Sequence, residues 1–235
     1  KSTSDFIANF ILAVLSVLTF AFLNSPVLVY KVGGWMPFEG IPIGIYLVLD
    51  GLSLLLLIIV NTIGFISLIF SISYMKRFTN KPLYHTLFLL MVAGMNGVVM
   101  SGDLFNMYVF LEVAAIASYA LVAFGTEAEE LEASFKYQVM GTVASAFILL
   151  GIIIIYSITG TLNLADIGRV LNDKVAKAPL ILTGILFLVG FGLKGAMMPF
   201  HAWLPDAHPS APAPGDALRS IDKGNRDIYF GQDYV

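Results

Sequence analysis

Two charged residues, Glu112 and Lys194, lie inside long apolar stretches of the sequence, at residues 104–124 and 179–198. A charge near the centre of a bilayer costs at least ~2.5 kcal/mol, so a chain keeps one there where a partner, water or a proton relieves the cost. An intramembrane carboxylate and an intramembrane ammonium therefore point to ion movement. The alternatives are a structural carboxylate hydrogen-bonded between helices for Glu112 and, for Lys194, a lysine whose ammonium reaches the membrane interface.

The composition indicates a membrane protein that holds no redox centre. Of the 235 residues, 58% are hydrophobic and 12% are charged, against about 25% charged in a typical soluble domain. The net charge of −3 gives no reason to expect nucleic acid as a partner. The absence of cysteine excludes disulfides, thiolate-held iron–sulfur clusters and cysteine-based zinc sites. We expect no metal, no cofactor and no catalytic residue.

Six apolar segments are long enough to cross a bilayer, which needs roughly 20 apolar residues per helix. This predicts an all-α membrane protein. The six segments are residues 5–23, 51–73, 83–101, 104–124, 135–158 and 179–199.

The connections carry further predictions. Residues 27–49 combine glycines and prolines with alternating apolar residues, which predicts an extended hairpin. Residues 161–177 have apolar positions at helical spacing with charges between them, which predicts a short interfacial helix. Asp50 stands where the second segment needs an N-cap, and Asp103 is interpreted as a turn or cap residue before the fourth.

Basic residues predict the orientation in the membrane. Lys76, Arg77 and Lys81 cluster between the second and third segments, and the positive-inside rule places that loop in the cytoplasm. The N-terminus and the loop at 125–134 then share the cytoplasmic side, and the hairpin faces outward. The basic residues of the 161–177 connection would lie outside, which argues against this orientation.

Three further residues are candidates for moving protons. Lys136 enters the fifth segment, where reaching for the interface and a functional role are both open. His201 follows Lys194 by seven residues and shares its face if the helix continues through Pro199. A proton relay is one interpretation of His201, and a histidine that bonds a free carbonyl at a helix end is the other. The orientation of His208 is not set by the sequence.

The sequence resembles the antiporter-like membrane subunits shared by complex I, membrane-bound hydrogenases and multisubunit Mrp sodium/proton antiporters. The D subunit of Mrp antiporters, or its hydrogenase counterpart, looks closest. The matching stretches cover most of residues 30–214 in family order. They are YKVGGWMP, LVLDGLSLLL, SGDLFNMYVFLEVAAIASYALVAFG, LEASFKYQVMGTVASAFILLGI, TGTLNLADI and GLKGAMMPFHAWLPDAHPSAPAP.

The resemblance implies a role for each candidate residue. Glu112 matches the essential glutamate of the family, Lys194 the lysine of its broken helix, and Lys136 a lysine on the helix that follows the glutamate. His201 and His208 match the PxHxWLPxAHxxAP pattern around the helix break. In the family, protonation and ion pairing of such groups switch a water-filled path across the membrane. The resemblance also implies a multi-pass protein of a prokaryotic cell membrane.

The leading hypothesis is translocation of protons, with Na⁺ as the alternative ion, inside a larger Mrp-type, hydrogenase or complex I-like assembly. We expect residues 1–214 to form the membrane domain, most of one antiporter-like repeat, and residues 215–235 to form a polar tail that departs from the family. The family continues into a second repeat, so we expect a neighbouring membrane subunit to complete the path. The rival hypothesis is a structural subunit that anchors a redox complex without conducting. A weaker third is quinone binding at HAWLPDAHP.

Overall fold

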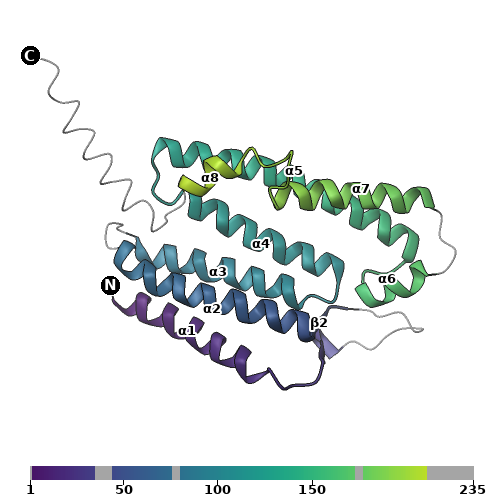
Figure 1. Cartoon of the computed structure of the whole chain (residues 1–235), viewed down its shortest axis with the longest axis horizontal. Coiled ribbons are helices and arrows are strands. Elements are labelled where there is room, and N and C mark those ends of the chain that lie inside the picture. The colour runs from purple at the N-terminus through teal and green to yellow at the C-terminus, as the bar shows by residue number, and fades with distance from the viewer. Residues whose placement is uncertain (1, 35–43, 76–79, 173–176, 211–235) are drawn as a thin grey trace, which may run out of the picture.

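The computed structural model describes residues 2–34, 44–75, 80–172 and 177–210. Six helices in the described part are long and apolar enough to cross a membrane, which confirms the predicted all-α fold. Figure 1 shows them running along a common direction, from α1 at one edge of the bundle to α5 and α7 at the other. The six are α1 (Ser2–Ala21), α2 (Gly51–Tyr74), α3 (Lys81–Met100), α4 (Leu104–Val122), α5 (Ala128–Thr159) and α7 (Lys177–Lys194).

The predicted hairpin and short helix both lie at one end of the bundle (Figure 1). Strands β1 (Leu28–Lys31) and β2 (Tyr46–Leu49) pair antiparallel; a short 3-10 helix, η1 (Val32–Gly34), follows β1, and residues 35–43 of the predicted hairpin lie outside the described residues. Helix α6 (Leu164–Leu171) begins after Asn163, whose side-chain oxygen accepts hydrogen bonds from two backbone N–H groups of the first turn. Such a cap satisfies N–H donors that have no partner inside the helix.

The opposite end carries the start of α1 beside the start of α3. The Asp5 carboxylate lies 3.7 Å from the Lys81 ammonium and 3.3 Å from His85 Nε2. Figure 1 places the α4–α5 connection at this same end. The helix directions therefore agree with the predicted topology. Lys76 and Arg77 lie outside the described residues, and the assignment of this end to the cytoplasm stays a prediction.

Two aspartates cap the helices that follow tight connections, as predicted. Asp50 Oδ1 accepts a hydrogen bond of 2.8 Å from the Ser53 N–H at the start of α2. The hydrogen bonds from Ser53 hold the pKa of Asp50 below its usual value. Asp103 Oδ1 accepts an equivalent 2.8 Å bond from the Asn106 N–H at the start of α4. Burial raises the pKa of Asp103 despite that bond.

Glycines bring α3 against α4 and α7 against α5. A Cβ on Gly94 would lie 2.6 Å from the Ala114 backbone nitrogen, and a Cβ on Gly190 would lie 2.6 Å from Ile148 Cγ1. Only a residue without a side chain fits at such a distance, which is how small residues permit close helix packing in membranes. The result is that α3 packs closely on α4, and α7 on α5.

Helix α7 ends at Lys194, five residues before the predicted end at residue 199. The Met197 N–H bonds the Gly192 carbonyl at 2.8 Å, and the Ala196 N–H bonds the Leu193 carbonyl at 3.3 Å. Ala196 has a φ of 49°. This is the Schellman arrangement, which closes a helix with one left-handed residue. A separate short helix, α8 (Leu204–Ser210), follows.

Candidate functional site

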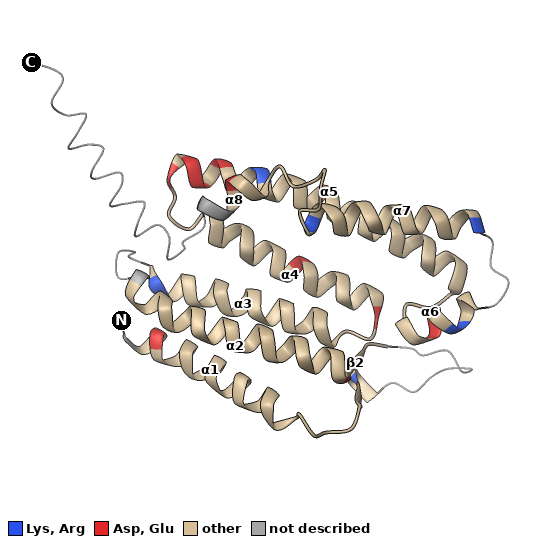
Figure 2. Ribbon diagram, in the orientation of Figure 1, with Lys and Arg blue, Asp and Glu red and all other residues tan. Residues whose placement is uncertain are grey.

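Glu112 lies near the middle of α4, about 12 Å from the helix start at 1.5 Å per residue. Figure 2 shows most charged residues near helix ends and connections, with an acidic position halfway along α4, whose sequence contains Glu112 as its one acidic residue. The predicted position of this carboxylate, halfway along its helix, therefore agrees with the structure. Its chemistry depends on the groups that contact it.

Lys194 is the partner of Glu112. The Lys194 Nζ atom lies 2.8 Å from Glu112 Oε1, although the two residues are 82 positions apart in the chain. The side chains are 14% and 27% exposed, so the pair is mostly but not fully withdrawn from the surface. Lys194 is also the last residue of α7, where a positive charge interacts favourably with the helix dipole. Each of the two charges therefore has the other as its counter-ion.

A third helix contributes a hydroxyl that the sequence analysis did not single out. Ser145 Oγ on α5 lies within hydrogen-bond distance of Glu112 Oε1 and 2.8 Å from the Gly141 carbonyl oxygen. Its single hydrogen can go to either acceptor. The sequence offers only a weak signal, because Ser145 is a hydroxyl residue in a mostly apolar run, and the structure shows it to be buried. The carboxylate therefore sits where α4, α5 and α7 meet.

Lys136 is not part of this cluster. Its Nζ atom lies 2.9 Å from Glu132 Oε1 and 2.9 Å from Asp206 Oδ2, and nearly half of its side chain is exposed. Along α5 it precedes Ser145 by nine residues, about 13 Å. Lys136 joins the start of α5 to α8 instead of joining the Glu112–Lys194 pair.

The structure separates the two histidines from the pair as far as it describes them. The shared face predicted for His201 and Lys194 requires a helix through Pro199, and α7 ends at Lys194 instead. That condition is not met, because the Schellman closure turns the chain away from the helix axis. His201 is exposed between α7 and α8. His208 lies in α8, and its side chain is outside the described residues.

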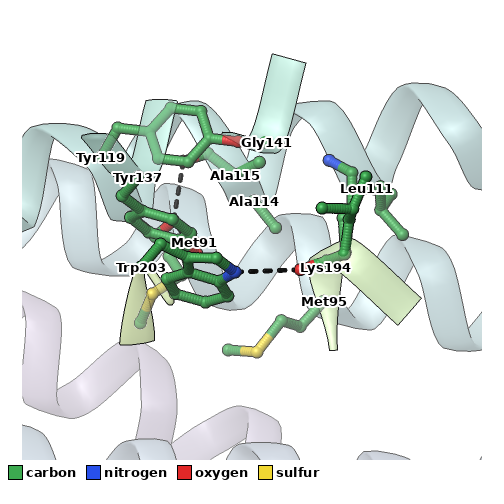
Figure 3. A pocket seen from close by; sticks show the side chains of 12 residues that line it. Met91, Met95, Leu111, Ala114, Ala115, Tyr119, Tyr137, Gly141, Lys194 and Trp203 are labelled. Carbon is green, nitrogen blue, oxygen red and sulfur yellow. Dashed lines mark hydrogen bonds between the residues drawn. The ribbon is translucent and has the colours of Figure 1, made fainter. Parts of the chain in front are cut away.

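A cavity of about 310 Å³ borders Lys194. A void of ~10–15 Å³ already holds a water molecule where polar partners are present. Here hydroxyl groups and the ammonium supply such partners within a mainly apolar lining (Figure 3). The lining residues are Met91, Met95, Leu111, Ala114, Ala115, Ser118, Tyr119, Tyr137, Gly141, Leu193, Lys194 and Trp203.

Aromatic rings form one wall of this cavity. Tyr137 and Trp203 stack with centroids 4.3 Å apart and 10° between the planes, and Tyr119 meets Tyr137 edge-on at 4.5 Å. Ser118 Oγ lies 3.1 Å from the Tyr137 hydroxyl. Figure 3 shows the Tyr137 and Trp203 rings beside the end of α7 that carries Lys194. These rings connect α4, α5 and the segment after α7.

The part of the chain that the structure describes contains no group of three or more histidine, cysteine or acidic residues that could hold a metal ion. The groups that meet at the site are a carboxylate, an ammonium and a hydroxyl. A carboxylate that contacts a hydroxyl and a lysine, where the lysine borders a cavity large enough for water, can change its protonation state when the lysine moves. The fold and this site define a multi-pass membrane protein with an ion pair of opposite charges between its helices.

Comparison with known families narrows this class to one family. Residues 101–221 match the family described as "NADH:quinone oxidoreductase/Mrp antiporter, TM". Residues 35–85 match the family described as "NADH-Ubiquinone oxidoreductase (complex I), chain 5 N-terminus". The first match alone covers more than half of the chain. The chain therefore belongs to the NADH:quinone oxidoreductase/Mrp antiporter family of membrane subunits.

Individual relatives come from several kinds of complex. The chain is 41% identical over 188 residues to the N subunit of NADH-quinone oxidoreductase from Desulforudis audaxviator, a match that covers 79% of this chain and 36% of the relative. It is 34% identical over 195 residues to the D subunit of a Na(+)/H(+) antiporter from Alkalihalophilus pseudofirmus, covering 83% of this chain and 39% of the relative. Among solved structures, the archaeal membrane-bound sulfane sulfur reductase superposes with a TM-score of 0.80 and 33% identity over 90% of this chain and 43% of that chain.

These matches confirm the family, the fold class and the prokaryotic membrane location implied by the resemblance. The chain spans less than half the length of the relatives it matches. The match to the first family ends at residue 221, a little beyond Pro214. The division of the chain at that proline stays a prediction.

Proposed function

We propose that this chain forms part of an ion path in a multisubunit prokaryotic membrane complex, and that the Glu112–Lys194 pair is the switch of that path. The ion is the proton, with Na⁺ as the alternative. The observation that carries the proposal is the 2.8 Å contact between a mid-helix carboxylate and the terminal lysine of a broken helix, beside a cavity of about 310 Å³.

The mechanism is electrostatic. With the Lys194 ammonium in contact, the negative form of Glu112 is favoured, since an opposite charge within hydrogen-bond distance stabilises it. When the lysine moves away, burial favours the neutral form, and the carboxyl takes a proton from water in the cavity. Return of the lysine expels that proton. Ser145 can follow the change, because its hydroxyl can donate to Glu112 Oε1 or to the Gly141 carbonyl.

The names of the relatives support transport inside a complex. The Alkalihalophilus relative belongs to a Na(+)/H(+) antiporter, the Desulforudis relative belongs to NADH-quinone oxidoreductase, and the archaeal structure is a respiratory membrane complex. We infer that this chain likewise works with other membrane subunits and that further helices complete the path. In this proposal the chain supplies one protonatable station, and a neighbouring subunit supplies the next.

The test is Glu112→Gln in the intact complex, with proton uptake measured in membrane vesicles by a pH-sensitive dye. Glutamine keeps the shape and the hydrogen bond to Ser145 but cannot ionise, so we expect transport to fall at least tenfold with assembly unchanged. Glu132→Gln is the matched control, because Glu132 is 68% exposed at the start of α5. We expect that variant to transport like the wild type.

The rival function is a structural subunit that anchors a redox complex without conducting. The observation that favours it is the contact of Glu112 with both α5 and α7, as a structural carboxylate between helices would have. The same experiment separates the two. If Glu112→Gln assembles and transports normally, the conducting role is wrong and the structural function gains.

A further inference from the structure

We propose that Trp203 is a positioning residue that holds Lys194 against Glu112, and that a clasp between α5 and the start of α8 holds Trp203 in place. The clasp consists of the Tyr137–Trp203 stack and the Lys136–Asp206 ion pair. The inference rests on the proposed function for the purpose of the pair, but its structural content does not depend on transport.

The first contact is a hydrogen bond at the end of α7. The indole Nε1–H of Trp203 donates to the Leu193 carbonyl at 3.0 Å, and the tryptophan is only 8% exposed. The last carbonyls of a helix lack partners within the helix, so an added donor fixes the final turn. The Ala196 N–H reaches the same oxygen at 3.3 Å, and the indole makes the shorter bond. Leu193 directly precedes Lys194, so this bond fixes the backbone from which the ammonium extends.

The second contact places the indole relative to the helices that surround the carboxylate. Trp203 stacks on Tyr137 of α5 with an angle of 10° between the rings. The Tyr137 hydroxyl in turn lies 3.1 Å from Ser118 Oγ on α4, the helix that carries Glu112. Aromatic pairs of this kind contribute beyond the area they bury. A continuous set of contacts therefore runs from the end of α7, through Trp203 and Tyr137, to α4.

The third contact closes the clasp at the protein surface. Lys136 Nζ lies 2.9 Å from Asp206 Oδ2. Lys136 directly precedes Tyr137 in the chain, and Asp206 follows Trp203 by three residues. Glu132 shares the Lys136 ammonium at the same distance. Because both partners of the Lys136–Asp206 bridge are about half exposed, this ion pair is the weaker part of the clasp. The buried indole hydrogen bond and the stack of Trp203 on the partly buried Tyr137 carry most of the effect.

The consequence is a mechanical link between α8 and the ion pair. The backbone that joins them, from Gly195 onward, has left the helix. If α8 moves away from α5, Trp203 loses its stack and no longer fixes Leu193, and the lysine is free to leave the carboxylate. The clasp gives Lys136 and Asp206 a role outside the proton path itself.

The test measures the protonation of Glu112 in the reconstituted complex by infrared spectroscopy, with Glu112→Gln assigning the carboxyl band. Trp203→Phe keeps a ring on Tyr137 and removes the N–H donor. We expect the protonated fraction of Glu112 at a fixed pH to rise about fivefold, in line with the loss of one buried hydrogen bond. Lys136→Met should raise it by less than about twofold, as expected for an exposed ion pair.

Two controls make the outcome decisive. Tyr137→Phe keeps the stack and the indole hydrogen bond and removes only the contact with Ser118 Oγ, so its protonated fraction of Glu112 should rise less than that of Trp203→Phe. If Trp203→Phe does not fold, β-(3-benzothienyl)alanine at position 203 keeps the ring size and still lacks the donor. A wild-type carboxyl band in either donor-free protein would overturn the proposal. The readout does not need transport, so normal transport in Glu112→Gln together with a shifted band in Trp203→Phe would remove the proposed function and leave the positioning role.

Discussion

Two polar contacts inside the helix bundle are built from different chemistry. Between α2 and α3, the Asn96 side-chain N–H donates to the Asn61 side-chain oxygen at 2.8 Å, and these residues are 9% and 1% exposed. Between α4 and α7, Lys194 meets Glu112 at the same distance, but the pair is more exposed and Lys194 borders a cavity. One contact joins neutral amides, and the other joins full charges.

The difference indicates which contact is structural. A neutral amide pair costs less to bury than two charges and can be buried almost completely, as the asparagines are, even though the Asn96 side-chain oxygen has no hydrogen-bond partner among the described residues. Charges are far more expensive to bury, and a well-packed apolar pair would hold two helices as well or better. The lysine of the charged pair also borders a cavity that is large enough for water. We infer that the asparagine contact has a structural role and holds α2 to α3. The charged contact is retained for a functional role, the proposed movement of ions.

The largest effect should come from breaking the charged pair on one side only. Lys194→Met leaves the Glu112 carboxylate without its cation, and we expect a loss of about 3 kcal/mol in the free energy of unfolding. This is the lower end of the range for buried pairs, since the glutamate is 27% exposed. Denaturant unfolding in detergent micelles measures it.

The double variant Glu112→Gln with Lys194→Met decides what the pair is for. With both charges gone, most of the lost stability should return while transport stays absent. Strictly additive losses in the two single variants and the double variant would show that the two residues are not coupled in the folded protein.

The next effect concerns how closely the helices approach in each region. A Cβ on Gly190 of α7 would meet Ile148 Cγ1 at 2.6 Å, whereas a Cβ on Gly64 of α2 would meet Val92 Cγ2 at an ordinary 3.4 Å. Gly190→Ala should therefore cost about 2 kcal/mol through overpacking and reduce transport. Gly64→Ala should be neutral or stabilising by up to about 1 kcal/mol, because alanine is the better helix former. Equal melting temperatures for the two variants would contradict the comparison.

The sequence predicts the spans well and the contacts between them poorly, and the reasons are physical. Apolar length identifies the spans of α1 to α5, and Asp50 indicates the start of α2 through its capping chemistry. The predicted start of the fifth segment at residue 135 is wrong, because a capping box of Glu127 and Glu130 begins α5 at Ala128, inside the polar stretch predicted as a loop.

The end of α7 escapes prediction because Ala196 adopts a left-handed conformation that alanine rarely takes. The clasp escapes it as well, because Lys136 and Asp206 are 70 residues apart in the chain.

The candidate site divides in the same way. Glu112 and Lys194 can be identified from the sequence, because each is a charged residue inside a long apolar run. Ser145 and the asparagine pair do not stand out, because an isolated polar neutral residue in a membrane helix has no spacing that reveals its partner. The direction in which a side chain points depends on the packing of three helices at once, and no single segment of the sequence encodes it.

A smaller effect is expected from the neutral contact. Asn96→Leu removes the amide that bonds Asn61, and we expect a loss of about 1 kcal/mol, the scale of hydrogen bonds between membrane helices. Transport in vesicles should remain at the wild-type level, since neither asparagine touches the charged pair. The matched double variant with Asn61→Leu should be no less stable than Asn96→Leu. A transport defect as large as that of Glu112→Gln would place the asparagines in the ion path and end the distinction drawn between the two contacts.

The smallest effect lies at the caps of the two helices that carry these contacts. Asp50 caps α2, and its pKa is lowered by hydrogen bonds from Ser53; Asp103 caps α4, and its pKa is raised by burial. A lowered pKa means that the ionised form stabilises the fold, so the contribution of Asp50 is present above the usual value of 3.8 and is lost as the pH falls. A raised pKa has the opposite sign, so ionisation of Asp103 opposes folding and its contribution falls as the pH rises through the folded pKa.

Asparagine caps helices as well as aspartate does. As the pH rises from about 3 to 7, Asp50→Asn should therefore lose stability relative to the wild type in the lower part of the range, below about pH 4, and Asp103→Asn should gain stability in the upper part, by less than about 1 kcal/mol. Melting temperatures measured across this range check both signs. If the melting temperatures of the two variants change with pH in the same way, the burial of Asp103 does not give its cap a pH dependence different from that of Asp50.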